Sequence, residues 1–297
     1  MTRISYSYCP LCYSERIQKQ TEVKDFSISG ELFEIYSCKA CGFRFTQNHP
    51  DETEIVPYYQ SEDYISHSDT SKGIINTIYH WVRKIMLWKK YLLIKKETTK
   101  KKLLDIGCGT GYFLNYMKNK SYQIYGVEKE KDAREFAINN FNIPVTSPDN
   151  FLQQELAEQY DIITLWHVLE HIQNFNEYLK SIHNKLNKNG ILVIALPNHR
   201  SYDARHYNQY WAGFDVPRHL WHFNPDSFEL LMKKHGFTIR KLKKLPFDSF
   251  YNALLSEKYR KNKLALLSGF FIGLISYINS IFYLKQTSSI IYICEKS

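Results

Sequence analysis

Residues 103–111 read Leu-Leu-Asp-Ile-Gly-Cys-Gly-Thr-Gly, a short apolar run that ends in an aspartate and three closely spaced glycines. The apolar run predicts a buried strand, and the apolar spacing through Met117 predicts a helix directly after the glycines. A second predicted strand, residues 123–127, ends at Glu128. Ligands of open α/β folds bind at the carboxyl edge of the sheet, so we expect Glu128 beside the glycine turn at such an edge.

The glycine turn is suited to a nucleotide-like ligand because glycine lets a ligand touch the backbone. Glu128 can accept hydrogen bonds from two ribose hydroxyls. The spacing is G-x-G-x-G, and Tyr112 stands where a nicotinamide or flavin protein has its last glycine. Asp105 would repel a pyrophosphate but suits a cationic methionine group.

Residues 105–111 resemble the first motif of class I S-adenosylmethionine (SAM)-dependent methyltransferases, and Glu128 resembles their ribose-binding acid. Residues 160–171 resemble the fourth strand of that family and the turn after it, and residues 186–194 resemble the fifth strand. The resemblance implies a doubly wound, Rossmann-like α/β domain with a seven-stranded sheet over residues 101–297, and SAM as cofactor. The cofactor-binding residues that it implies are Asp105, Gly107, Cys108, Gly109, Gly111, Glu128, Trp166 and His167.

Residues 167–171 also spell H-x-x-E-H, which is a metalloprotease pattern when it lies on one helix. The strand predicted just before it disfavours that reading. For His171, a structural role stays open beside a functional one.

Two C-x-x-C pairs, Cys9 with Cys12 and Cys38 with Cys41, stand near the N-terminus. Four thiolates suit tetrahedral zinc and leave no open coordination position, so the predicted role is structural. The segment between the pairs alternates like short strands, and a piece of this size needs a metal to fold. We therefore expect a zinc-ribbon-like module over residues 1–50, followed by a linker and flanking helix over residues 51–100.

Residues 197–224 form a predicted insert that leaves the carboxyl edge of the sheet and can roof the substrate. Residues 218–224 resemble a segment of zinc-containing sugar C-methyltransferases, which implies His219 as general base. Arg218 replaces the acidic residue of that family, so this sequence departs from the pattern there. The candidate substrate residues are Tyr207, Trp211, Asp215, Arg218 and His222.

Residues 249–286 form a predicted helical insert in which residues 264–284 carry no charge and follow a basic run. Three interpretations stay open: a membrane span, a peripheral membrane contact through residues 258–284, and ordinary packing or a homodimer face. A span is disfavoured because residues 288–294 look like the last strand of the family, which must return to the sheet.

The net charge of +9 permits nucleic acid, an anionic surface or phosphorylated substrates as partners. The first residues carry no apolar signal-peptide core, which predicts a cytoplasmic protein with membrane association left open. The favoured function is methyl transfer from SAM to a small-molecule, sugar or lipid-linked acceptor. An RNA methyltransferase whose zinc module binds RNA is the alternative, disfavoured because basic residues are scattered. A non-enzymatic zinc module on a vestigial fold is the third interpretation.

Overall fold

The computed structural model describes residues 3–59, 74–153, 158–245 and 247–297. Its strands are β1 (Arg3–Ile4), β2 (Ile17–Lys24), β3 (Leu32–Cys38), β4 (Arg44–Gln47), β5 (His49–Pro50), β6 (Lys102–Ile106), β7 (Gln123–Val127), β8 (Val145–Thr146), β9 (Tyr160–Trp166), β10 (Leu186–Pro197), β11 (Trp221–His222), β12 (Phe237–Lys244) and β13 (Ser289–Lys296). Its α-helices are α2 (Ile74–Glu97), α3 (Tyr112–Lys118), α4 (Lys131–Phe141), α5 (Pro148–Gln153), α6 (Phe175–Lys185), α7 (Tyr202–Tyr207), α8 (Pro225–Lys234), α9 (Asp248–Tyr259) and α10 (Ala265–Phe282).

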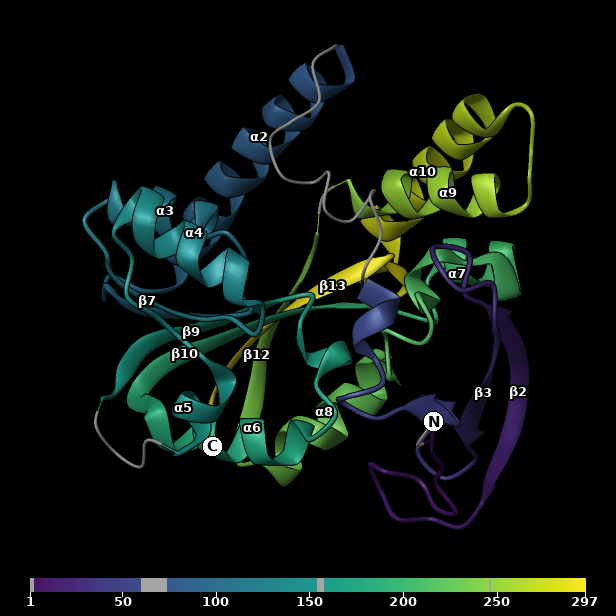
Figure 1. The fold of residues 1–297 in the computed structure, drawn as a ribbon, viewed down its shortest axis with the longest axis horizontal. Coiled ribbons are helices and arrows are strands. Elements are labelled where there is room, and N and C mark those ends of the chain that lie inside the picture. The colour runs from purple at the N-terminus through teal and green to yellow at the C-terminus, as the bar shows by residue number, and fades with distance from the viewer. Residues whose placement is uncertain (1–2, 60–73, 154–157, 246) are drawn as a thin grey trace.

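A seven-stranded sheet with the order β12-β13-β10-β9-β6-β7-β8 forms the centre of the molecule. Strands β6, β7, β8, β9 and β10 are parallel, and β13 runs antiparallel between β10 and β12. Helices α2, α3 and α4 lie on one face, and α5, α6 and α8 lie on the other (Figure 1). This arrangement confirms the predicted doubly wound α/β fold, including the return of the last strand to the sheet.

The central strands are apolar because both of their faces are covered. Along β10, successive side chains alternate between two buried clusters: Leu192 packs on the side of α6 and α8, and Val193 packs on the side of α2 and α3. Both side chains are fully buried. Burial on two faces holds the strand ends rigidly, which is what a binding site at the sheet edge requires.

The N-terminal module is joined to the central domain by a shared sheet. Strands β2, β3 and β4 continue into β11, which comes from the predicted substrate loop, and Trp221 pairs with Phe45. The ring of Phe43 lies 5.2 Å from the ring of Phe223, between centroids, within one continuous core. The predicted boundary at residue 50 therefore does not separate two independent cores.

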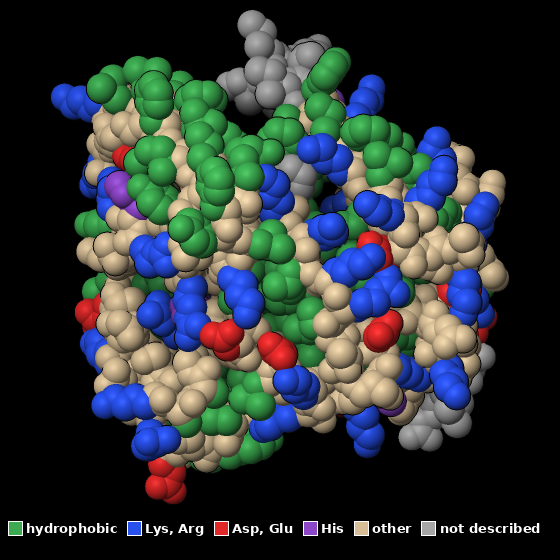
Figure 2. Space-filling model, turned by 180° about the vertical axis from the view of Figure 1, so that it is seen from behind, with side chains coloured by type: hydrophobic (Ala, Val, Ile, Leu, Met, Phe, Trp, Pro, Cys, Tyr) green, Lys and Arg blue, Asp and Glu red, His purple; other side chains and the backbone are tan. Residues whose placement is uncertain are grey.

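Helices α9 and α10 form a hairpin between β12 and β13, within the range of the predicted helical insert. Figure 2 shows hydrophobic side chains crowded over this hairpin, at the upper left of the view. The predicted linker lies partly outside the described residues, whereas the flanking helix is present as α2.

Candidate active site

The three glycines after β6 all adopt positive φ angles: 71° at Gly107, 54° at Gly109 and 81° at Gly111. A Cβ atom on Gly107 would lie 2.3 Å from Val168, and one on Gly111 would lie 2.9 Å from Ala137, so both are packed against protein. A Cβ atom on Gly109 would have no described atom within 4 Å. The middle glycine therefore faces the open side of the turn, where a ligand can approach the backbone.

The Glu128 carboxylate is fixed against this turn by two backbone donors. Oε2 accepts from the Gly109 N–H at 2.7 Å, and Oε1 accepts from the Glu130 N–H at 2.9 Å. Each carboxylate oxygen has a second lone pair. The side chain is therefore oriented and still able to accept two hydroxyl donors from a ribose.

Asp105 lies beneath the turn and is only 3% exposed. Burial raises its pKa to about 7, because the opposing effects of the Thr164 hydroxyl and the Lys90 ammonium are smaller. The Thr164 hydroxyl donates to Oδ1 at 2.5 Å. A positive charge brought next to this carboxyl group would favour its ionised form.

Lys90 reaches the same place from α2, and the sequence pattern alone did not single it out. Its Nζ lies 4.3 Å from the centre of the Trp166 ring and 5.3 Å from that of Phe113. Burial lowers its pKa to about 8, although Asp105 and Asp248 act in the other direction. The sequence holds one signal for Lys90: it stands four residues before Ile94 and therefore on the same face of the helix. The structure buries Ile94 fully, so this face packs against the domain.

His167 follows the last residue of β9 with a positive φ of 58°. Its Nδ1 lies 3.2 Å from Oε1 of Glu170, and its Nε2 lies 3.2 Å from Oδ2 of Asp248. Burial lowers the pKa of His167, but the two carboxylates outweigh it and raise the pKa to about 10. His167 is therefore a cation at neutral pH, and Asp248, the first residue of α9, is a second member of the site that sequence reasoning missed.

Glu170, His171 and His219 form a buried cluster next to this ion pair. The Nδ1 of His171 donates to the Arg218 carbonyl at 3.0 Å, and the Nδ1 of His219 donates to the Gly213 carbonyl at 2.9 Å. With Nδ1 as the donor, a neutral imidazole carries its lone pair on Nε2. In the described part of the chain, Oε2 of Glu170 is buried without a hydrogen-bond partner.

One polar side-chain atom of each of these three residues lies within 4.8 Å of the other two. Burial and the neighbouring His219 lower the pKa of His171 to about 4. Such a set can receive a proton or a hydroxyl group, and two imidazoles with one carboxylate can also hold a cation. The cluster joins His219, which the sequence predicted as a base, to two residues of the strand-end turn.

The predicted substrate residues are mostly engaged with the protein itself. Tyr207 donates to Glu257 at 3.0 Å, and the Trp211 indole donates to Asp203 at 2.8 Å. The Nε2 of His222 lies 3.0 Å from the Thr46 hydroxyl, and burial lowers its pKa well below the usual value. These contacts hold the loop in place, and a direct contact with substrate stays a prediction.

Arg218 and Asp215 form an ion pair in the same loop, with Nη2 2.7 Å from Oδ1. Arg218 also pairs with Asp25 at 3.2 Å and donates to the Tyr58 carbonyl at 2.8 Å. Their charges are satisfied by these partners and tie the loop to the N-terminal module. Their role toward substrate also stays a prediction.

The four cysteines of the N-terminal pairs converge. The Sγ atoms of Cys9 and Cys41 lie 3.7 Å apart, and those of Cys12 and Cys38 lie 3.5 Å apart. Thiolates about 2.3 Å from a tetrahedral zinc ion lie slightly under 4 Å from one another, so the spacing fits a zinc site with four cysteine ligands. Cys108 stands apart from them in the glycine turn, where it is buried.

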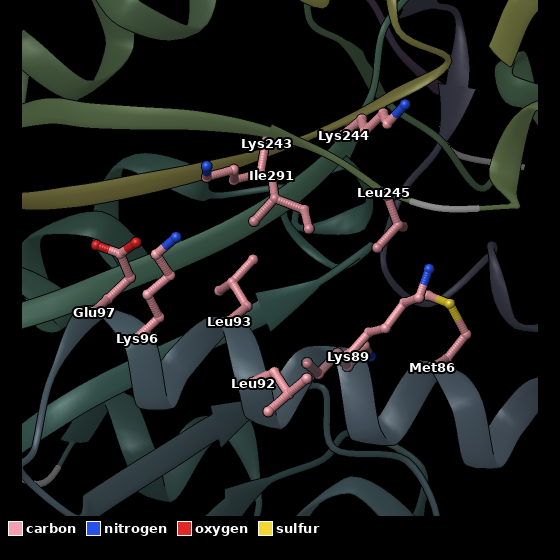
Figure 3. A pocket seen from close by; sticks show the side chains of 11 residues that line it. Met86, Lys89, Leu92, Leu93, Lys96, Glu97, Lys243, Lys244, Leu245 and Ile291 are labelled. Carbon is pink, nitrogen blue, oxygen red and sulfur yellow. The ribbon is translucent and has the colours of Figure 1, made fainter. Parts of the chain in front are cut away.

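A groove of about 280 Å³ lies between α2 and β12, away from the glycine turn. Its floor is apolar, and lysines from both elements stand at its rim (Figure 3). The residues that line it are Met86, Lys89, Lys90, Leu92, Leu93, Lys96, Glu97, Lys243, Lys244, Leu245 and Ile291. Among these residues, Lys90 also approaches Trp166 at the end of β9.

Comparison with known proteins agrees with this geometry. A family model described as a methyltransferase domain matches residues 79–242, just over half of the chain. A ubiquinone biosynthesis O-methyltransferase from Glaesserella parasuis is 35% identical over 108 residues, which cover 33% of this chain and 46% of the relative. The chain thus spans about half the length of such curated relatives.

A protein of the same description from Rickettsia canadensis is 22% identical over 209 residues, covering 63% of this chain and 85% of the relative. Among solved structures, magnesium protoporphyrin IX methyltransferase from Synechocystis, with bound SAH, aligns with a TM-score of 0.52 and 12% identity. The alignment covers 83% of this chain and 100% of that one, and it shows a shared fold. The chain therefore belongs to the methyltransferase domain family.

Proposed function

We propose that this protein methylates a hydroxyl group of a small, largely apolar acceptor, with His219 as general base. The observation that carries the proposal is the close approach of Glu170, His171 and His219, each with one polar side-chain atom within 4.8 Å of the other two, together with the buried Oε2 of Glu170, which has no hydrogen-bond partner among the described residues. A hydroxyl group is the donor that this arrangement lacks. Buried acceptors without a donor are costly, so a substrate that supplies one gains both affinity and orientation.

The cofactor site is proposed to bind SAM through three charged side chains. Glu128 would accept the ribose hydroxyls, Lys90 would pair with the methionine carboxylate, and Asp105 would face the positive charges. When bound, SAM supplies an electrophilic methyl group on a sulfonium. The backbone of Gly107, Cys108, Gly109 and Gly111, together with Trp166 and His167, would complete the walls of this site.

His219 is proposed to accept the proton of the acceptor hydroxyl on Nε2. The Gly213 carbonyl fixes the ring through Nδ1, as a general base requires. The Glu170 carboxylate would stabilise the imidazolium that forms. Because alignment of nucleophile and methyl group supplies much of the rate in such displacements, the rigid loop contacts of Arg218 and Trp211 would position the base rather than react.

The acceptor class rests on the names of the relatives and on the apolar character of the nearby surface. Two of the relatives described above are named ubiquinone biosynthesis O-methyltransferases, which favours a small-molecule acceptor over RNA. A sugar or a lipid-linked molecule remains within the proposal. The RNA methyltransferase interpretation receives no support from these relatives.

The cluster of Cys9, Cys12, Cys38 and Cys41 is proposed to bind structural zinc, and the chain is proposed to act in the cytoplasm. The division into residues 1–50, 51–100 and 101–297 is kept as a functional division, although the first and last parts share a core. Zinc would hold two turns together in a module whose sheet needs β11 to complete it.

Titration calorimetry with SAM, followed by mass spectrometry of extracts incubated with the enzyme and SAM, tests the proposal. We expect micromolar or tighter binding of SAM and an apolar product that gains the mass of one methyl group on oxygen. A methylated RNA as the only product, or methylation on carbon or nitrogen, would contradict it.

A further inference from the structure

Helix α10 has small residues on its buried face and large apolar residues on its exposed face, the reverse of a usual surface helix. Its buried residues are small: Gly269, Gly273, Ser276 and Ser280. Its large apolar residues point outward, and Leu266 and Phe282 are 74% and 75% exposed. The exposed large apolar residues of α10 and its two ends are Leu264, Leu266, Leu267, Phe270, Phe271, Ile275, Ile278, Ile281, Phe282 and Tyr283. Soluble proteins seldom leave so large a continuous apolar surface without a partner.

The small residues of α10 let it pack tightly on α9. A Cβ atom on Gly269 would lie 2.8 Å from the Cα of Leu254, and one on Gly273 would lie 2.8 Å from the Cα of Phe250. By length and composition alone, α10 could cross a membrane, and only 22% of it is buried in the protein, so it is not a core helix. Its inner face is therefore fixed to α9, while its outer face has no partner in the described structure.

Helix α9 is in turn anchored to the catalytic domain by buried hydrogen bonds. The Ser256 hydroxyl accepts from the Ala212 N–H at 2.9 Å, and the Asn252 amide donates to Ser288 at 2.8 Å. Directly after α10, strand β13 returns to the central sheet. A membrane-spanning α10 would have to break these contacts, so the apolar face can meet a membrane only from one side.

The charged residues next to the apolar segment in the sequence are all positive, and one of them, Lys285, lies 3.8 Å from Asp226 of α8. Lys258, Arg260, Lys261 and Lys263 precede the segment, and Lys285 follows it. No acidic residue occurs in the sequence from residue 258 to residue 294. Figure 2 shows lysine and arginine side chains bordering the apolar surface. An apolar face flanked by basic residues is complementary to the interface of an anionic bilayer.

We propose that the α9–α10 hairpin docks this protein on the surface of an anionic membrane. The outer face of α10 lies among the acyl chains just below the headgroups, and the basic ends bind lipid phosphates. A second copy of the chain is a poorer occupant, because a symmetric pair would bring equal basic clusters into the same interface.

Docking in this orientation turns the catalytic edge of the sheet toward the membrane. The hairpin follows the carboxyl end of β12, and its first residue, Asp248, contacts His167 at 3.2 Å. Lys244 stands at the rim of the lysine-lined groove (Figure 3). Its Nζ lies 3.9 Å from the ring centre of Tyr277 on α10. An apolar acceptor could thus pass from the bilayer to the site; this consequence, unlike the docking, rests on the proposed function.

Co-sedimentation of the full chain with vesicles tests the docking. Vesicles of phosphatidylglycerol and phosphatidylcholine should pellet the protein in the absence of SAM and acceptor. Vesicles of phosphatidylcholine alone should bind the protein at least about tenfold more weakly. The triple variant Leu266→Ser, Phe271→Ser, Phe282→Ser should lose binding by about tenfold or more, since it removes buried apolar contact with lipid. Lys261→Glu with Lys263→Glu should lose binding to the anionic vesicles.

The matched control is Tyr8→Ser with Leu32→Ser, which removes exposed apolar side chains from the N-terminal module and should leave binding unchanged. Unchanged melting temperature and SAM affinity would show that the triple variant folds. Wild-type protein that stays in the supernatant, or a triple variant that still pellets, would overturn the proposal. So would a concentration-dependent dimer, seen by sedimentation velocity without vesicles, that the triple variant abolishes. Because none of these measurements needs turnover, a failed docking is distinguishable from a failed assignment of the reaction.

Discussion

The imidazole of His167 and the carboxylate of Asp248 are 3.2 Å apart, and they join the end of the central strand β9 to the first residue of the hairpin helix α9. The two residues are far apart in the sequence, and both are partly exposed. Their contact links the cofactor edge of the sheet to the apolar insert. A substitution of either residue should therefore affect both the edge of the sheet at β9 and the α9–α10 hairpin.

Asp248→Asn should lower the pKa of His167 from about 10 toward its usual value. Because a raised histidine pKa stabilises the fold fully below the unfolded value of 6.5 and loses that effect as the pH rises through 10, the variant should be weakened more at low pH. We expect the free energy of unfolding to fall by about 1–2 kcal/mol near pH 6 and by less near pH 10. The loss is small because the pair is partly exposed to solvent. Thermal unfolding at both pH values, with NMR titration of the ring, measures this effect. An unaltered histidine titration in the variant would contradict the pairing.

Asp105→Asn should stabilise the free protein while weakening SAM binding. Burial raises the Asp105 pKa from 3.8 to about 7, so ionisation of this carboxyl group at pH 8 lowers the free energy of unfolding. The amide of the variant does not ionise and avoids this cost. At about 1.4 kcal/mol per pKa unit the cost is a few kcal/mol. Calorimetry should show SAM affinity falling about tenfold or more in the variant, and wild-type affinity rising with pH through 7 as the carboxyl group ionises.

The control for this change is Asp161→Asn, at the far end of β9, where the carboxylate pairs with Lys100 at 3.6 Å. It should leave SAM affinity unchanged. Equal affinity of the Asp105→Asn variant and the wild type at pH 8 would remove Asp105 from the cofactor site.

Gly109→Arg should abolish SAM binding and leave zinc bound. A side chain at this position enters the open space in front of the turn, and the positive φ adds about 1–2 kcal/mol of backbone strain. Gly30→Arg provides the matched control, because Gly30 has a φ of 72° in a turn that belongs to the N-terminal module. It should bear a similar strain and still bind SAM. Calorimetry with SAM and zinc analysis by atomic emission compare the two variants; normal SAM affinity in Gly109→Arg would contradict the site.

The sequence predicted the central architecture because its signals are local. Apolar runs, the glycine turn and Asn224, which caps α8, each act over a few neighbouring residues. Lys90 and Asp248 were not predicted, because they reach the site from helices that precede and follow it at long range. The pairing of β11 with β4 has the same origin: nothing in either short segment specifies the other.

The insert at residues 197–224 shows a second limit. Its aromatic and charged residues indicated a substrate surface, but residue type does not reveal whether a side chain's partner is a ligand or another part of the protein. Trp211 and Arg218 have protein partners, and both are buried. His219, by contrast, lies in the cluster with Glu170 and His171.

His219→Ala should lower kcat by about 10²–10⁴-fold with little change in SAM affinity, as the removal of a general base does. His206→Ala, in the same insert but paired with Tyr207 by a ring contact of 4.7 Å, should retain activity. Steady-state kinetics with the acceptor identified from extracts, and calorimetry with SAM, separate the two effects. A variant with wild-type turnover would reduce His219 to a packing residue.

Loss of zinc should slow methyl transfer through the loop that carries His219. The Thr46 hydroxyl on β4 donates to the His219 carbonyl at 2.7 Å, and the Thr46 N–H donates to the Leu220 carbonyl at 2.9 Å. Strand β4 in turn pairs with β3, which ends at Cys38, a predicted zinc ligand. A disordered zinc module would therefore release the backbone of the proposed base while leaving Gly109 and Glu128 in place.

Cys38→Ser should thus reduce the zinc content and kcat together while SAM affinity changes little. Thr46→Val, which keeps the zinc and removes one hydrogen bond, should give a smaller loss of kcat, corresponding to about 1 kcal/mol. Zinc analysis, steady-state kinetics and SAM calorimetry on both variants separate this coupling from a general loss of folding. If Cys38→Ser lost its zinc but kept full turnover, the module would not support the catalytic loop. If it lost SAM binding to the same extent as turnover, the effect would be global unfolding, because the hydrogen bonds that hold Glu128 and Asp105 come from Gly109, Glu130 and Thr164 of the central domain.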